Sequence, residues 1–254
     1  MSRKKSKEFR FDFQAVFEPE DYLYFYQDTL TKERTEKEIA FLVRELKLDR
    51  PKKILDLACG YGRHSNRLAQ LGHQMVGVDL TPGFLKIAKA EARKKRLQVK
   101  YLHQDMRKIK FKAEFDRVFL LFTAFGYFSD WENFQVLKKI SRSLKPGGLF
   151  CMDSFNYRQF LKDFRPLMVK EKGRDLMIER NYFDPASSRI YNRRIVVRNG
   201  KRKDKPFFIR IYQIPELKKL LARAGMRIMR IYGDWDDQKL SHHSRRMIII
   251  AQKL

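Results

Sequence analysis

Short apolar segments alternate with amphipathic helical patterns between residues 53 and 153, and this alternation constrains the fold more than any other feature. The alternation predicts strands at 53–57, 74–78, 98–103, 116–121 and 149–153, separated by helices at 64–71, 82–96 and 131–144. Strands joined in this way form parallel βαβ units, whose sheet is covered by helices on both faces. The sequence therefore predicts a doubly wound α/β fold.

The flanking segments extend this prediction. A helix is expected at 31–48, with Thr31 as its N-cap and Pro51 after its end. After about Arg165, apolar and polar residues alternate between Asp-Pro and Asn-Gly turns, which predicts an antiparallel β insertion with strands at 168–180, 189–198 and 206–212. A short helix at 215–224 then leads to strands at 226–232 and 247–252, which would complete a mostly parallel sheet of seven strands.

The charge of the chain is strongly positive, because 56 Lys and Arg residues against 30 Asp and Glu residues leave a formal net charge of +26. Such a field attracts polyanions, since each neutralised phosphate releases counterions. A nucleic acid, RNA or DNA, is therefore the expected partner, ahead of an acidic membrane. A charged thermophile surface is the alternative, although such surfaces usually gain Glu alongside Lys and this chain does not.

The cysteines and the apolar segments indicate a cytoplasmic protein. Cys59 and Cys151 lie far apart in a turn and a strand, which favours a reducing compartment without disulfides. No apolar segment follows the basic N-terminal residues, so no secretory signal is expected. The longest apolar run, 118–128, is too short to cross a bilayer as a helix.

The strongest local signal is the segment 54–64, which reads as a strand, a turn with Gly60 and Gly62, and the start of a helix. Small residues are needed where the backbone approaches a ligand at the carboxyl end of a strand. Asp56 precedes this turn, and Asp79 ends the next strand, where a carboxylate can accept hydrogen bonds from an adenosine ribose. A glycine turn alone also suits plain packing or a dinucleotide, but the dinucleotide turn needs a third glycine that this chain lacks.

Residues 54–64 resemble the first motif of the class I S-adenosylmethionine-dependent methyltransferases, in which an acid precedes a small-x-Gly-x-Gly turn. Ala58 stands where that pattern often has its first glycine. Residues 78–82 are similar to the family's ribose-binding turn, 103–106 to its adenine-contacting turn and 144–149 to its late loop. The resemblance covers residues 52–153 in the family's order and spacing.

This resemblance implies S-adenosyl-L-methionine as the cofactor and S-adenosyl-L-homocysteine as the product. It assigns Gly60 and Gly62, together with Ala58, to the methionine half of the cofactor, and Asp56 to its ammonium group. Asp79 would accept hydrogen bonds from the ribose.

The resemblance extends to the adenine end and to the N-terminal segment. Leu80 would lie beside the ribose, Asp105 would accept the adenine amino group, and Met106 would offer a backbone N–H and an apolar face. Tyr26 and Arg34 are candidates to close over the cofactor, with Arg34 pairing with its carboxylate. A solvated position on a helix is the alternative for Arg34.

Methyl transfer is an in-line displacement from a sulfonium, so the protein mainly supplies alignment. The acceptor is expected beyond the fourth strand, at residues 121–128, whose aromatic rings could stack on a flat base. Phe122 is expected either in the core or against the cofactor. Tyr127, His64 and Asp153 are the candidates for a general base, although none has a partner in the sequence pattern that would set its pKa.

Several other chemistries are not indicated. Residues 123–126 lack the Pro-Pro-aromatic motif of many base amino-group methyltransferases, which leaves N-methylation by another route open. Methylation at carbon 5 of a pyrimidine needs a nucleophilic cysteine, but Cys59 and Cys151 are expected to be buried. His242 and His243 lack partners at metal-ligand spacing, so no metal is expected.

The β insertion is densely basic and carries interleaved aromatic residues. Nine of its residues could form a phosphate-tracking surface: Arg189, Arg193, Arg194, Arg198, Lys201, Arg202, Lys203, Lys205 and Arg210. Polar strand positions that simply face water are the alternative.

The chain is expected to have four parts: a basic disordered arm (1–10), N-terminal helices with the cofactor-binding core (11–165), the β insertion as a lid on the acceptor side (166–213), and a C-terminal return to the sheet (214–254). The expected function is N-methylation of a base in structured ribosomal or transfer RNA. A small-molecule amine or carboxylate methyltransferase is the alternative. A non-enzymatic RNA chaperone is a third hypothesis, against which the intact cofactor residues argue.

Overall fold

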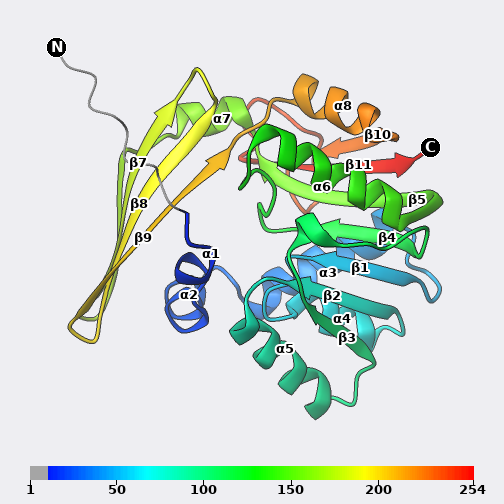
Figure 1. Ribbon diagram of the computed structural model, residues 1–254, viewed down its shortest axis with the longest axis horizontal. Helices are drawn as coiled ribbons and strands as arrows, with labels where there is room; N and C mark the ends of the chain where they lie inside the picture. Colours follow the sequence, from blue (N-terminus) through cyan, green and yellow to red (C-terminus); the bar gives the residue numbers. More distant parts are fainter. Residues whose placement is uncertain (1–10) are drawn as a thin grey trace.

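The computed structural model describes residues 11–254, and its larger sheet has the expected α/β architecture (Figure 1). The strands of this sheet are β1 (Lys53–Leu57), β2 (Gln74–Asp79), β3 (Val99–His103), β4 (Phe115–Leu120), β5 (Leu144–Phe155), β10 (Met226–Tyr232) and β11 (Arg246–Lys253). They lie in the order β10-β11-β5-β4-β1-β2-β3, and β11 is antiparallel to both of its neighbours. The prediction of a mostly parallel, seven-stranded sheet is confirmed.

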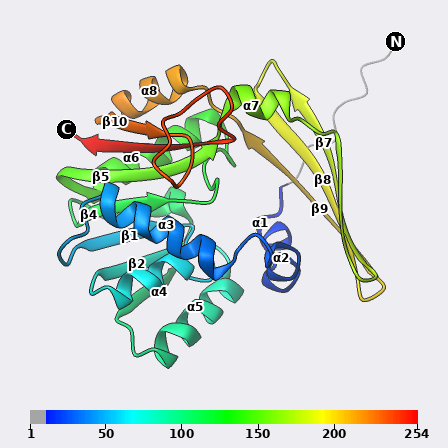
Figure 2. The same ribbon diagram turned by 180° about the vertical axis from the view of Figure 1, so that it is seen from behind.

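Helices cover both faces of this sheet, because alternate strand residues point to opposite sides. One face is covered by α6 (Asp130–Ser143) and α8 (Ile214–Arg223), and the other by α3 (Lys32–Glu45), α4 (Arg63–Gln70) and α5 (Pro82–Lys94) (Figures 1 and 2). Within β1, Leu55 belongs to the core under α6, whereas its neighbour Ile54 belongs to the core under α3. Both side chains are fully buried.

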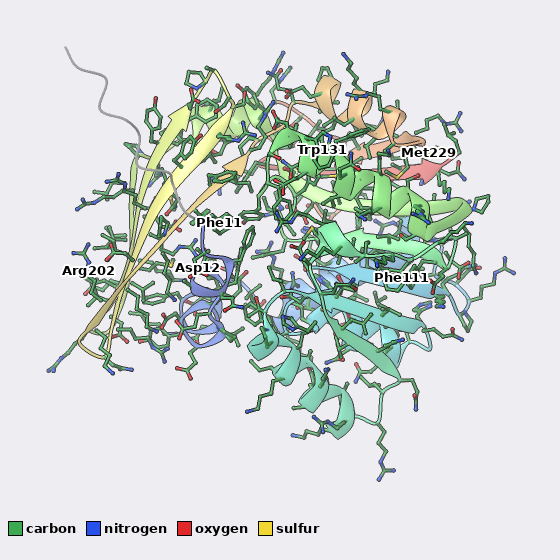
Figure 3. All side chains as sticks on the ribbon, viewed as in Figure 1. Phe11, Asp12, Phe111, Trp131, Arg202 and Met229 are labelled. Carbon is green, nitrogen blue, oxygen red and sulfur yellow. The ribbon has the colours of Figure 1, made fainter. Side chains whose placement is uncertain are left out.

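A second, four-stranded sheet stands beside the larger one (Figure 1). It is an antiparallel meander of β6 (Leu167–Lys172), β7 (Asp175–Asp184), β8 (Arg189–Arg198) and β9 (Lys201–Arg210). The short helices α1 (Phe13–Val16) and α2 (Pro19–Tyr26) lie between the two sheets, and α7 (Tyr157–Lys162) leads into β6. Figure 3 shows Phe11 in this space, where its ring contacts Tyr127 and Phe207.

Some elements differ from the prediction. Residues 168–180, predicted as one strand, belong to both β6 and β7, because the chain turns at Gly173 with φ +61° while the alternation continues on either side. Residues 145–148, predicted as a turn, lie within β5 but bulge from its ladder, since Leu144 pairs with Phe115 and Leu149 with Arg117. The helices α1, α2 and α7 are too short for the hydrophobic pattern to indicate.

The N-terminal basic arm expected at residues 1–10 lies outside the described residues. Within residues 11–254, no helix is both long enough and apolar enough to cross a membrane.

Most basic residues of the four-stranded sheet are paired inside the protein. Seven of the nine residues expected to track phosphates form ion pairs: Arg189, Arg194, Arg198, Arg202, Lys203, Lys205 and Arg210. The alternation of strand residues turns several of them toward the acids of α2 and β7, which neutralise them. Carboxylates of this chain therefore compensate part of the positive charge that was expected to track phosphates.

A buried ion pair joins this sheet to α2. Lys205 Nζ lies 2.7 Å from Asp21 Oδ2, and each residue is only 3% exposed. Lys203 and Arg198 also approach the Asp21 carboxylate, at 3.0 and 3.2 Å. Burial acts to raise the pKa of Asp21, but hydrogen bonds with Glu18, Lys205 and Lys203 hold it well below its ordinary value. The carboxylate is therefore ionised at neutral pH, and it compensates buried positive charge.

We predict that Asp21→Asn lowers the free energy of unfolding by about 3 kcal/mol, because it leaves the buried Lys205 ammonium with incomplete compensation. Asp204→Asn is the matched control, since Asp204 pairs with Arg202 on the surface and its loss should cost less than about 1 kcal/mol. Urea denaturation of both variants measures the difference. Equal losses would contradict the proposed role of the buried pair.

Candidate active site

A cavity lies at the carboxyl ends of β1 to β4, where the turns after these strands meet. Its remaining walls come from the N-terminal segment, including Phe13, Phe17 and Tyr22. In open parallel sheets, ligands bind at this edge, because neighbouring turns there diverge and leave a crevice. We refer to it as the first cavity.

The turn after β1 has an unusual backbone. Ala58, Gly60 and Gly62 all have positive φ, at 53°, 54° and 79°. A Cβ on Gly62 would lie 2.3 Å from the Tyr101 hydroxyl oxygen, whereas a Cβ on Gly60 would meet no atom within 4 Å. Glycine at 62 is thus required by packing, and glycine at 60 leaves bare backbone in the cavity wall. Ala58 adopts the left-handed conformation itself, so alanine serves where the resemblance suggested glycine.

Two buried carboxylates lie beside this turn. Asp79 accepts hydrogen bonds from the backbone N–H groups of Gly60 and Thr81, each at 2.8 Å. Asp56 accepts a hydrogen bond from Ser65 Oγ at 2.6 Å. Burial raises the pKa of Asp56 to about 7 and also raises the pKa of Asp79. Carboxylates held in this way favour a ligand that brings positive charge or hydrogen-bond donors.

A charged cluster around Glu38 supports the same wall. Glu38 is 1% exposed and pairs with Arg34 Nε at 2.8 Å, with His64 Nε2 at 2.8 Å and with Arg63. Burial acts to raise the pKa of Glu38, but hydrogen bonds and charges from His64 and Arg63 hold it below its ordinary value. Arg34 packs over the Phe122 ring and is not part of the cavity wall, whereas Arg63 is. The sequence reasoning missed Glu38 and Arg63, although the spacing of Arg34 and Glu38 suits a helical ion pair.

At the adenine side, the structure gives Asp105 a different partner. Its carboxylate accepts hydrogen bonds from the Arg107 backbone N–H at 2.8 Å and from the Arg107 guanidinium at 2.7 Å. This pairing competes with the adenine contact expected from the resemblance. Met106, which begins the short 3-10 helix Met106–Lys108, and Leu80 both line the first cavity as half-buried residues.

A second cavity of about 750 Å³ adjoins the first, between α7, the turn after β4 and the four-stranded sheet. The two cavities share four aromatic walls: Phe17, Tyr22, Phe122 and Tyr127. Tyr26, expected to close over the cofactor, instead lines the second cavity, where its hydroxyl accepts a hydrogen bond from Arg194 at 3.0 Å. Arg194 also donates two hydrogen bonds to Glu179 Oε1, at 2.9 and 2.6 Å.

None of the three expected bases presents a free basic group. Burial, with a contribution from Arg63, lowers the pKa of His64 to about 4, and its Nε2 is directed at Glu38. Burial raises the pKa of the Tyr127 hydroxyl, which therefore stays protonated near neutral pH. Asp153 is fully buried outside the walls of both cavities and pairs with Arg246.

Cysteine and metal chemistry have no support in the described residues. Cys59 and Cys151 are both buried, and burial raises the pKa of each thiol, which disfavours a thiolate nucleophile. Across residues 11–254, no group of three or more His, Cys, Asp or Glu residues could hold a metal ion.

The fold and the first cavity define a protein that binds a nucleoside-containing cofactor at the edge of a Rossmann-like sheet. A family model described as "Methyltransferase domain" matches residues 54–148. The Bacillus subtilis (strain 168) protein "Putative methyltransferase YqeM" is 28% identical over 216 residues, which cover 82% of this chain and 87% of that protein.

Two solved structures share the whole fold. An S-adenosylmethionine-dependent methyltransferase from Clostridium acetobutylicum has a TM-score of 0.78 at 21% identity and covers 92% of this chain and 98% of its own. CalS10, an amino pentose methyltransferase from Micromonospora echinaspora with S-adenosylmethionine bound, has a TM-score of 0.68 at 20% identity and covers 92% and 97%. The methyltransferase domain at residues 54–148 and the named relatives support a class I S-adenosylmethionine-dependent methyltransferase, with S-adenosylmethionine as the cofactor.

The raised pKa of Asp56 predicts a pH-dependent stability. Between about pH 4 and pH 7, the folded state holds a proton on Asp56 that the unfolded state has lost, so the Asp56 contribution to the free energy of unfolding falls as the pH rises. Asp56→Asn removes this pH-dependent contribution and keeps a side-chain oxygen that can accept a hydrogen bond from Ser65 Oγ. In urea denaturation, the free energy of unfolding of the variant relative to that of the wild type should rise by on the order of 2 kcal/mol between pH 5 and pH 8. A constant difference between the two proteins would contradict the prediction.

Proposed function

We propose that the first cavity holds the cofactor with its methionine half over the turn after β1 and its ribose at Asp79. Three observations support this placement. The backbone at Gly60 is open toward the cavity, Asp56 and Asp79 are buried at its wall, and Arg63 brings a positive charge that suits a carboxylate. When bound, the cofactor supplies an activated methyl group on a sulfonium.

We further propose that the acceptor is a small molecule that is methylated on an amine nitrogen in the second cavity. The observation that carries this proposal is the Glu179 carboxylate in a cavity that shares aromatic walls with the first. A volume of about 750 Å³ lies in the usual range for small-molecule sites, which is roughly 300–1,000 Å³. Phe122 and Tyr127, which line both cavities, lie on the path from one site to the other.

The chemistry of an amine acceptor agrees with these walls. The nitrogen lone pair forms the new N–C bond as the C–S bond breaks, so the amine must reach the site neutral and aligned. Arg194 holds Glu179 through the oxygen Oε1, which leaves Oε2 to accept an N–H of the acceptor. Aromatic rings beside the amine also favour the positive charge that develops on nitrogen.

The other acceptors have less support. A carboxylate acceptor could pair with basic residues of the cavity wall such as Lys162 and Arg165, but it brings no N–H for the Oε2 oxygen of Glu179. A base in structured RNA needs a phosphate-binding surface around the cavity, and seven of the nine residues expected to supply one are paired within the protein. The amino pentose acceptor in the name of CalS10 agrees with an amine.

Incubation with labelled S-adenosylmethionine and a panel of amino sugars, amino acids and polyamines, with total RNA in a parallel reaction, tests the acceptor class. Label in an amine supports the proposal, and label in RNA alone overturns it. For the amine that is labelled, Glu179→Gln should lower kcat/KM at least about a hundredfold, because the acceptor loses its hydrogen-bond partner.

Glu171→Gln is the matched control, since Glu171 is an exposed carboxylate on β6 and lines neither cavity. It should leave kcat/KM within about threefold of the wild type. Affinity for S-adenosylhomocysteine, measured by calorimetry, shows whether Glu179→Gln keeps the cofactor site. A Glu179→Gln protein that binds this product normally and methylates the amine at the wild-type rate would remove Glu179 from the proposal.

A further inference from the structure

The segment between the two cavities has a strained backbone. Phe122 and Thr123, directly after β4, have φ of 61° and 59°. Within residues 11–254, they are the only adjacent non-glycine residues with positive φ. This conformation is unfavourable for L residues, most of all for aromatic and β-branched side chains, and persists only where surrounding groups enforce it.

Asp153 and Arg246 hold Phe122 and Thr123 in this conformation. Asp153, on β5, is fully buried, and its Oδ1 accepts hydrogen bonds from the backbone N–H groups of Phe122 and Thr123. Arg246, on β11, pairs with the Asp153 carboxylate and donates a hydrogen bond to Thr123 Oγ1 at 2.9 Å. Two neighbouring strands of the larger sheet thus hold both the backbone and the side chain of this segment.

The position of the segment connects it to both ligands. Phe122 lines both cavities, and Thr123 lines the second. The Phe122 ring also lies under the guanidinium groups of Arg34 and Arg63, at 5.2 and 5.6 Å from the ring centroid. If the segment relaxed to an extended conformation, Phe122 would leave this place and both cavity walls would change.

We propose that Asp153 and Arg246 are positioning residues, which hold Phe122 and Thr123 in a left-handed conformation and so shape the wall shared by the cofactor site and the acceptor cavity. Neither residue needs to touch the reacting atoms. Methyl transfer depends on the alignment of two ligands, so a wall common to both determines their relative placement. The proposal holds for any acceptor.

Glycine rescue tests this proposal, because glycine adopts positive φ without the penalty of other residues. Asp153→Asn should weaken binding of S-adenosylhomocysteine, measured by calorimetry, by about tenfold, since the uncharged amide oxygen accepts weaker hydrogen bonds from Phe122 and Thr123 and the ion pair with Arg246 is lost. Adding Thr123→Gly to Asp153→Asn should restore the affinity to within about threefold of the wild type, because the left-handed backbone then needs less support.

Glu45→Gln is the matched control, since Glu45 is a buried carboxylate that pairs with Arg230 and lines neither cavity. It should lower stability in urea denaturation and leave the affinity for S-adenosylhomocysteine within about threefold. A purely structural role for Asp153 predicts the same outcome for Asp153→Asn, with lost stability and unchanged affinity, and that outcome overturns the proposal. An Asp153→Asn protein that glycine does not rescue overturns it as well.

If Asp153→Asn does not fold, Arg246→Lys replaces it, because lysine keeps the charge but its shorter side chain does not bring a nitrogen to the position from which Arg246 Nη2 bonds both Asp153 and Thr123 Oγ1. The same rescue by Thr123→Gly is then expected. Once an acceptor is known, Thr123→Gly should also restore kcat in the Arg246→Lys variant, a rescue that the loss of a direct acceptor contact by Arg246 in the second cavity would not allow.

Discussion

The turn after β1 is the constraint on which the site depends. Parallel strands end at one edge of their sheet, so the segments after β1, β2, β3 and β4 meet there whatever their sequences are. Only a left-handed backbone with little side-chain bulk lets this turn pass between Tyr101 and the cavity. Asp79, at the end of β2, then accepts a hydrogen bond from the Gly60 N–H and so ties the turn after β1 to the neighbouring strand.

Compensation of buried charge governs the rest of the architecture. The four-stranded sheet contributes positive side chains to its inner face, and α2 and β7 supply carboxylates that meet them. A buried ion pair adds little net stability, but a buried charge left without its partner destabilises the fold strongly. Separation of α2 from the four-stranded sheet is therefore unfavourable. This coupling keeps α2 and the sheet in place around the second cavity.

Two cavities with shared aromatic walls suit a reaction that transfers a methyl group from one ligand to another. The cofactor carries the reactive group, so the contribution of the protein is distance, angle and exclusion of water. Phe122 and Tyr127 line both cavities, so a ligand in either cavity would share these walls with a ligand in the other. The absence of a free base at His64, Tyr127 or Asp153 agrees with chemistry that relies on alignment.

Hydrophobic period and turn residues, which are local properties, were enough to predict the parallel sheet, its helices, the antiparallel insertion and the segment around Gly60 and Gly62. They could not show that one predicted strand contained the turn at Gly173. They also could not reveal helices that are too short to display a helical hydrophobic period. The partners of charged residues are not local either. Only the tertiary structure placed Glu38 against Arg63 and His64, and Asp21 against Lys205, because these pairs form between elements distant in sequence and depend on which face each side chain occupies.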